Sequence, residues 1–145
     1  MFSAFKRSIP QISIFHRTSS PPSQMALRIL QGALSSPYPP YAHTEHPLEF
    51  NLEVIEDRPP TPDQIRTILS YTNASSPDTL LYPYSGSLSQ GKDRTPEEVT
   101  SLVQQNPKVL KWPIVVDWDG GRAAVGDLEG VKNILENLGK QRDGQ

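Results

Sequence analysis

The 145-residue sequence contains no cysteine. Disulfide exchange, a thiolate nucleophile and any zinc or iron–sulfur site held by cysteine are therefore excluded for the side chains of this chain. Histidine is also scarce, and His16, His43 and His46 form neither an HxxxH nor an HExxH pattern, so no metal site is predicted. A Gly-rich phosphate-binding pattern such as GxGxxG is absent too, and we expect no cofactor.

Acidic residues are missing from the first part of the chain. Residues 1–44 carry four basic residues and no Asp or Glu, whereas residues 45–145 carry ten basic and sixteen acidic residues. A basic, serine-containing start without acidic residues is typical of a mitochondrial import signal. We therefore expect a leader over residues 1–10 and a mitochondrial location; the alternative is an N-terminus without a targeting role.

Long hydrophobic runs are absent as well. No apolar run approaches the roughly 20 residues that a membrane span needs, so no membrane partner is expected. The net charge of −2 gives no indication of nucleic-acid binding. The length fits one domain, which we place over residues 11–139, followed by a polar tail over residues 140–145.

The first half of the chain predicts a strand, a helix and a second strand. "QISIFH" (Gln11–His16) has the β-branched and aromatic residues of a strand. Ser19 or Ser20 can then cap a helix whose first turn accepts the following prolines. "FNLEVIE" (Phe50–Glu56) alternates apolar and polar residues and predicts the second strand.

Two later helices are predicted by the same local signal. In "TPDQIRTILSY" the helix cap is Thr61, with Gln64 as its partner three positions on; "TPEEVTSLVQQN" repeats the arrangement with Thr95 and Glu98. The segment 73–94 between them is longer than an ordinary connection. It is either an ordered excursion or a mobile flap, and it is a candidate surface for protein partners.

The last part of the chain predicts a hairpin and a helix. Ile114–Trp118 and Arg122–Gly126 flank a Gly-containing turn, and Asp127 can cap the helix that follows. The order is β-α-β-α-loop-α-β-β-α, in which the first β-α-β unit requires a parallel pair and the last two strands an antiparallel one. The sequence thus predicts an α/β protein with a mixed four-stranded sheet flanked by helices. This is the arrangement of a thioredoxin-like fold, although other α/β sandwiches have the same number of elements.

Two segments resemble a known group of proteins. "SIFHRTSSPPSQMALRIL" and "NPKVLKWPIVVDWDGGRAAVG" are similar to parts of the arsenate-reductase and glutaredoxin-like branch of thioredoxin-fold proteins. The closer resemblance, through "FNLEVIEDRPPTPDQIRTIL" and "WPIVVDW…GRAAVG", is to a fungal family regarded as mitochondrial redox proteins with a thioredoxin fold. It spans roughly Ile12 to Leu138.

This resemblance implies where a site would lie. It places Pro113 at the cis-proline of the fold, which exposes the main chain of Trp112 beside the start of the first helix. A trans proline that merely begins a strand is the alternative. The catalytic thiol of the relatives falls at Ser20 or, by a second alignment, near Leu102, and neither position has sulfur.

Serine is a poor replacement for that thiol. A serine nucleophile needs a base that a third group orients, and His16 has no acidic residue before Glu45 to orient it. A helix-capping role for Ser20 is therefore favoured over a hydrolytic Ser20–His16 pair. Redox catalysis by this chain's own thiols is excluded.

A weaker binding role remains open. Free N–H groups at the start of the first helix, nearby hydroxyls and cations could hold glutathione or a small anion. The candidate binding residues are His16, Arg17, Ser19, Ser20, Ser23, Lys111, Trp112 and Pro113. The resemblance implies an oxidoreductase acting on small toxic molecules or glutathione-type thiols, and the lack of cysteine favours the alternative, a non-catalytic binding or interaction module on the same scaffold.

Overall fold

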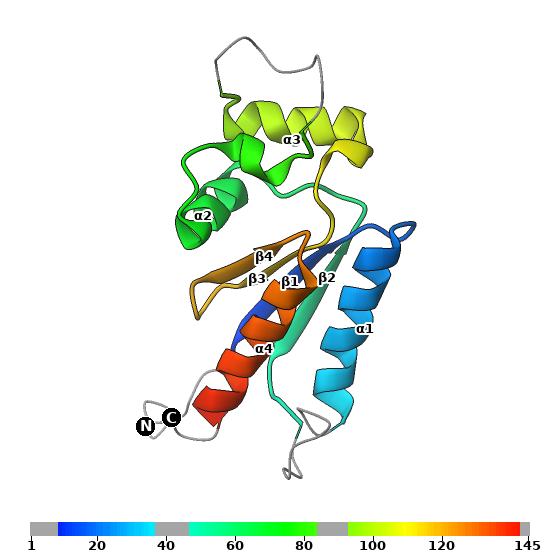
Figure 1. Cartoon of the computed structure of the whole chain (residues 1–145), viewed down its shortest axis with the longest axis vertical. Coiled ribbons are helices and arrows are strands. Elements are labelled where there is room, and N and C mark those ends of the chain that lie inside the picture. Colours follow the sequence, from blue (N-terminus) through cyan, green and yellow to red (C-terminus); the bar gives the residue numbers. More distant parts are fainter. Residues whose placement is uncertain (1–8, 37–46, 84–92, 143–145) are drawn as a thin grey trace, which may run out of the picture.

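A computed structural model describes residues 9–36, 47–83 and 93–142, and Figure 1 shows their arrangement. Residues 1–8 of the predicted leader, the histidines at positions 43 and 46, residues 84–92 of the long loop and residues 143–145 lie outside the described part. In chain order the structure consists of β1 (Gln11–His16), α1 (Pro21–Ser35), β2 (Asn51–Glu56), α2 (Pro62–Thr72), η2 (Pro77–Leu80), α3 (Pro96–Gln105), η3 (Pro107–Val109), β3 (Ile114–Asp117), β4 (Arg122–Val125) and α4 (Leu128–Arg142).

The four strands form one mixed sheet in the order β2-β1-β3-β4. β1 pairs with β2 in parallel, and β3 runs antiparallel to both β1 and β4. This confirms the predicted sheet. β1 and β3 are the central strands and are almost entirely buried, whereas β2 and β4 form the two edges.

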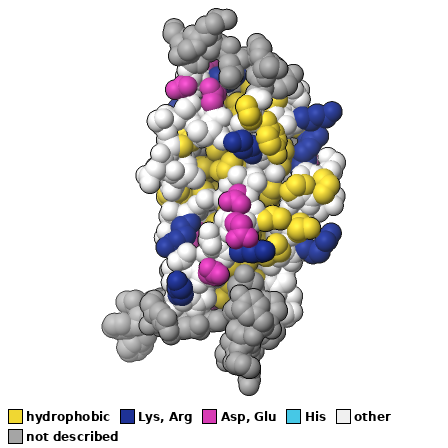
Figure 2. All heavy atoms as spheres, viewed as in Figure 1, with side chains coloured by type: hydrophobic (Ala, Val, Ile, Leu, Met, Phe, Trp, Pro, Cys, Tyr) yellow, Lys and Arg dark blue, Asp and Glu magenta, His cyan; other side chains and the backbone are white. Residues whose placement is uncertain are grey.

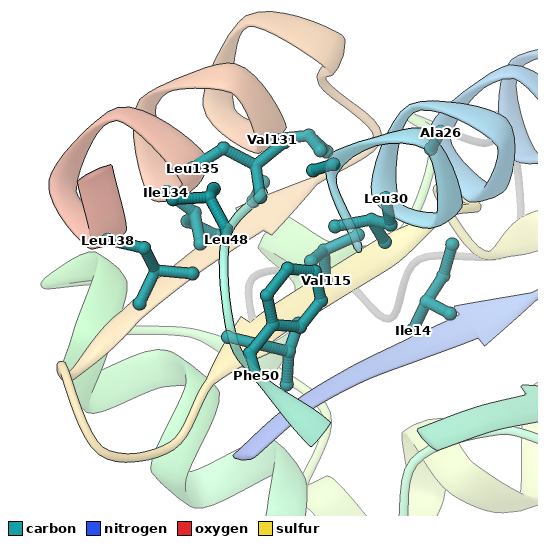
Figure 3. Close-up of a cluster of buried hydrophobic side chains, with 13 residues drawn as sticks. Ile14, Ala26, Leu30, Leu48, Phe50, Val115, Val131, Ile134, Leu135 and Leu138 are labelled. Atoms are coloured by element: carbon teal, nitrogen blue, oxygen red, sulfur yellow. The ribbon is translucent and has the colours of Figure 1, made fainter. Parts of the chain in front are cut away.

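Helices pack against both faces of the sheet, and the helices on each face cover one hydrophobic cluster. On one face, α1 and α4 meet over Ile14 and Val115, with Phe50 between them (Figure 3). On the other face, α2 and α3 cover Phe15 and Ile114. Successive side chains of a strand point to opposite faces, so adjacent residues of β1 and β3 contribute to different clusters.

The helix starts follow the predicted local chemistry. The side chains of Thr61 and Thr95 cap α2 and α3. The side-chain oxygens of the residues three positions on, Gln64 and Glu98, accept hydrogen bonds from the backbone amides of these caps. Asp127 accepts a hydrogen bond of 3.0 Å from the Glu129 amide at the start of α4. These contacts satisfy amide groups that have no partner inside a helix.

The structure differs from the sequence prediction in two connections. The first residues of the 73–94 loop are ordered as η2, whose Leu80 is buried, and Leu81 forms an isolated bridge with Leu110. A second short helix, η3, precedes β3 and was not predicted. The start of the long loop is therefore an ordered excursion, packed by its own leucines.

The ends of the predicted segments also shift slightly. β2 begins at Asn51, one residue later than expected, and α4 continues to Arg142, beyond the expected domain end at residue 139. Among the described residues, none of the helices combines the length and the apolar character that crossing a bilayer requires.

Candidate site at the strand ends

The C-terminal ends of β1 and β2 and the start of β3 lie at the same end of the sheet. The register pairs His16 with Glu56 and Phe15 with Ile114, so His16 lies opposite Pro113, which immediately precedes β3. We use the name strand-end site for His16, Asp57, Pro113 and the loop Arg17–Ser20. The topology thus brings together segments that are far apart in the sequence, including most of the predicted binding residues.

The Trp112–Pro113 peptide bond is cis, as the resemblance implies, and the trans alternative is wrong. Trp112 is 4% exposed and its indole N–H donates to the Pro107 carbonyl at 2.7 Å. The main-chain N–H of Trp112 donates to the Leu110 carbonyl at 2.9 Å. Of the three polar groups of Trp112, only the carbonyl lacks a hydrogen-bond partner among the described residues. The main chain of Trp112 is therefore less open to a ligand than expected.

Ser20 is the N-cap of α1. Its hydroxyl oxygen accepts a hydrogen bond of 3.4 Å from the Ser23 amide, and Pro21 and Pro22 fill the first two helical positions. The capping role favoured from the sequence is therefore confirmed. The hydroxyl at the position where the resemblance implies a thiol therefore caps the helix.

His16 pairs with Ser23 and not with Ser20. The His16 Nδ1 atom lies 2.6 Å from the Ser23 hydroxyl oxygen, and the two residues are 4% and 0% exposed. The same oxygen accepts the Arg17 amide at 3.0 Å. Ser23 therefore joins the end of β1 to the first turn of α1, an internal role instead of the predicted ligand contact. The Ser20–His16 pair considered as a nucleophile is not formed.

Asp57 is the residue of this site that the sequence analysis missed. It follows β2 with a φ of 57°, a left-handed conformation in which Asp and Asn are enriched. Its amide donates to the His16 carbonyl at 2.7 Å. Its carboxylate accepts two hydrogen bonds from Thr18, one from the amide at 3.1 Å and one from the hydroxyl at 3.0 Å. A polar turn residue after a strand parallel to β1 was the available signal.

Few main-chain donors remain free at the start of α1. The Thr18 amide is bound by Asp57, the Ser20 amide donates to the Arg17 carbonyl at 3.0 Å, and the Ser23 amide donates to its cap. The two prolines have no N–H to offer. Among the described residues of this loop, Ser19 alone has an amide without a partner. The expected set of free N–H groups for an anion is therefore reduced to one.

Side chains supply the remaining binding potential. Arg17 and Lys111 are partly exposed and have no ion-pair partner among the described residues. In the first turns of α1, Pro21 and Pro22 are exposed, and 48% of the surface of Met25 is exposed to solvent. On the face drawn in Figure 2, hydrophobic side chains reach the surface in patches, with both Lys or Arg and Asp or Glu side chains among them.

Leu102, the second predicted thiol position, lies elsewhere. It belongs to α3 and packs against the cluster that α2 and α3 cover, whereas Ser20 begins α1 on the other face of the sheet. The two alternative positions therefore do not form one site.

A separate cavity of about 470 Å³ opens over β1 and β2. Phe15 and Ile55 form part of its apolar wall, and Arg58, Gln64 and Thr100 are among its polar lining residues. It lies on the face that α2 and α3 cover, and of the predicted binding residues it includes none. Among the described residues, no group of three or more His, Asp or Glu side chains could hold a metal ion.

A contact between α2 and α3 shifts the pKa values of Arg66 and Glu97. The pKa of Glu97 is lowered because Arg66 donates a hydrogen bond of 2.5 Å to its carboxylate, and the same contact raises the pKa of Arg66. Arg66 also reaches Asp63 at 2.9 Å. This network ties two helix surfaces together and contributes no group to the strand-end site.

The fold belongs to a known structural class. The structure aligns with "Arsenate reductase from Vibrio cholerae" at a TM-score of 0.57 and 16% identity, over 88% of this chain and 99% of the other. It aligns with "Putative arsenate reductase from Yersinia pestis" at a TM-score of 0.51 and 18% identity, over 86% and 98% of the two chains. At such identities the likeness establishes the thioredoxin-like fold.

The sequence defines the family more narrowly. Residues 2–126 match the family described as "Protein of unknown function (DUF1687)", and the chain belongs to that family. A comparison with curated protein sequences gives no significant match.

Proposed function

We propose that this chain is a redox-related thioredoxin-fold protein that acts as a binding module without thiol catalysis. The observation that carries the proposal is the state of Ser20. At the position where the resemblance implies a thiol, Ser20 has a hydroxyl that caps α1, and the one imidazole of the described residues, that of His16, is engaged with Ser23. An un-ionised hydroxyl without a base does not perform nucleophilic catalysis. A role in oxidoreduction of small toxic molecules is therefore the less favoured function.

The ligand we propose is an acidic, glutathione-like peptide. Support comes from the Arg17 and Lys111 side chains, the Ser19 amide and the Trp112 carbonyl, all free of partners among the described residues. A peptide has carboxylates for the cations and an amide for the carbonyl. The exposed surface of Met25 offers contact to its apolar part.

The test is an NMR amide titration of the labelled protein with reduced glutathione. We expect saturable shifts at Ser19 and near Lys111. Arg17→Ala should weaken binding by about fivefold, since an exposed charge pair contributes at most roughly 1 kcal/mol. Arg28→Ala is the matched control, because Arg28 is an exposed arginine further along α1.

Three outcomes contradict the proposal. Equal weakening by both arginine variants would show nonspecific charge attraction, and an absence of shifts at millimolar glutathione would redirect the search to protein partners of the 73–94 loop. Reduction of insulin disulfides or arsenate by the purified chain would contradict the lack of thiol catalysis.

We further propose that the protein acts in mitochondria, as the resemblance to the fungal redox family implies. The support is the sequence of residues 1–44, which is basic and free of acidic residues. A fluorescent protein fused after residue 145 should co-localise with a mitochondrial marker. Exchanging Lys6 and Arg7 for Gln should release it, whereas cytosolic signal from the unchanged chain would refute the proposal.

A further inference from the structure

We propose that the Asp57 carboxylate occupies the two hydrogen-bond donors of Thr18, in the loop Arg17–Ser20, and thereby keeps free oxyanions from binding to those two donors. The two carboxylate oxygens of Asp57 accept separate hydrogen bonds from one residue, at 3.1 Å from the Thr18 amide and 3.0 Å from the Thr18 hydroxyl. Paired donors of this kind are those that would hold two oxygens of a phosphate or an arsenate. A charged group of the chain already holds them.

The backbone fixes Asp57 in this position. Its amide donates to the His16 carbonyl at 2.7 Å, which continues the β1–β2 ladder by one residue. The left-handed φ of 57° turns the chain immediately after the strand. The carboxylate is thereby held at the same end of the sheet as Thr18, although Asp57 and Thr18 are 39 positions apart.

An attached carboxylate has a large advantage over a free anion. Tethering converts binding into an intramolecular event with an effective concentration of roughly millimolar or more. Phosphate that binds these donors no better than a carboxylate must therefore exceed this effective concentration before it displaces Asp57. The native site then favours ligands that do not use the Thr18 donors.

This inference concerns the same site as the proposed function but uses other groups. The proposed peptide contacts are Arg17, Lys111 and the Ser19 amide, whereas Asp57 controls Thr18. Glutathione binding to the unchanged protein tests the function. Phosphate binding after removal of the carboxylate tests the role of Asp57, so either result can fail alone.

The experiment compares Asp57→Gly with the unchanged protein, using inorganic phosphate as the probe and the Thr18 amide as the NMR reporter. Glycine accepts the positive φ without strain, so the variant removes the carboxylate and keeps the backbone. We expect little shift of the Thr18 amide in the unchanged protein and saturable binding, at least tenfold tighter, in the variant. Asp119→Gly is the control, because its carboxylate accepts the Gln11 amide at 2.6 Å at the other end of β1.

A second variant covers the case in which Asp57→Gly does not fold. Asp57→Asn tolerates the left-handed conformation, removes the charge and replaces one acceptor oxygen with an NH2 donor. It should bind phosphate more tightly than the unchanged protein, though less than the glycine variant. Equal phosphate affinity in the unchanged protein and in a folded Asp57 variant would overturn the proposal, as would the same gain in Asp119→Gly.

Discussion

Ser20 stands at the position where the resemblance implies a catalytic thiol. The hydroxyl remains at the first turn of α1, where it accepts the Ser23 amide as a helix cap. A thiol in this position would be favoured as the thiolate by the positive end of the helix dipole. The local structure is thus compatible with thiol chemistry, although the residue is not.

Restoring a thiol tests this interpretation. In Ser20→Cys the pKa of the new thiol should lie below the ordinary value of about 8.5 because it faces the N-terminal end of α1. In the control Ser35→Cys the thiol lies at the exposed C-terminal end of the same helix and its pKa should be at or above that value. Alkylation by iodoacetamide as a function of pH measures both, and equal pKa values would contradict the helix effect.

Four helices of the described part of the chain begin in the same way. The caps of α1, α2, η2 and α3 are Ser20, Thr61, Ser76 and Thr95, and a proline follows each of them. The cap oxygen satisfies an amide in the first turn, and the proline occupies a position where a missing N–H costs nothing. These local signals set where the helices begin, and tertiary packing then determines which face each helix buries.

The cap of α3 makes a measurable contribution to stability. Thr95→Ala removes the acceptor of the Glu98 amide, held at 3.1 Å, and should lower the free energy of unfolding by about 1 kcal/mol. Ser101→Ala, an exposed position on the same helix, is the control and should change it by less than about 0.5 kcal/mol. Urea denaturation measures both. An equal loss in the two variants would assign the effect to helix propensity instead of the cap.

Across the molecule, the features that could be predicted from the sequence are those that depend on residues close together in the chain. β1, the two capping boxes and the hairpin were found correctly because each depends on residues close together in the chain. The contact of Asp57 with Thr18 was missed because it joins residues 39 positions apart, and the Thr18 amide is not free because of that contact. Likewise η2 owes its order to burial of Leu80 in the cluster beneath α2 and α3, which no local pattern indicates.

The sheet as a whole should exchange its amide hydrogens unevenly. β1 has a partner strand on both sides, whereas β2 has one on a single side. The Asn51 and Asp57 amides point toward β1, and because parallel ladders alternate, those of Leu52, Val54 and Glu56 point away from it.

We therefore expect protection factors at least about tenfold higher for the amides of Ile14 and Phe15 than for that of Val54, measured by NMR hydrogen exchange. The amides of Glu53 and Ile55 are the internal control, since they lie in the same edge strand but point toward β1. Protection of the Val54 amide equal to that of Ile55 would contradict an open edge. It would mean that a further chain segment pairs with β2 in solution, beside the loop that Asp57 holds.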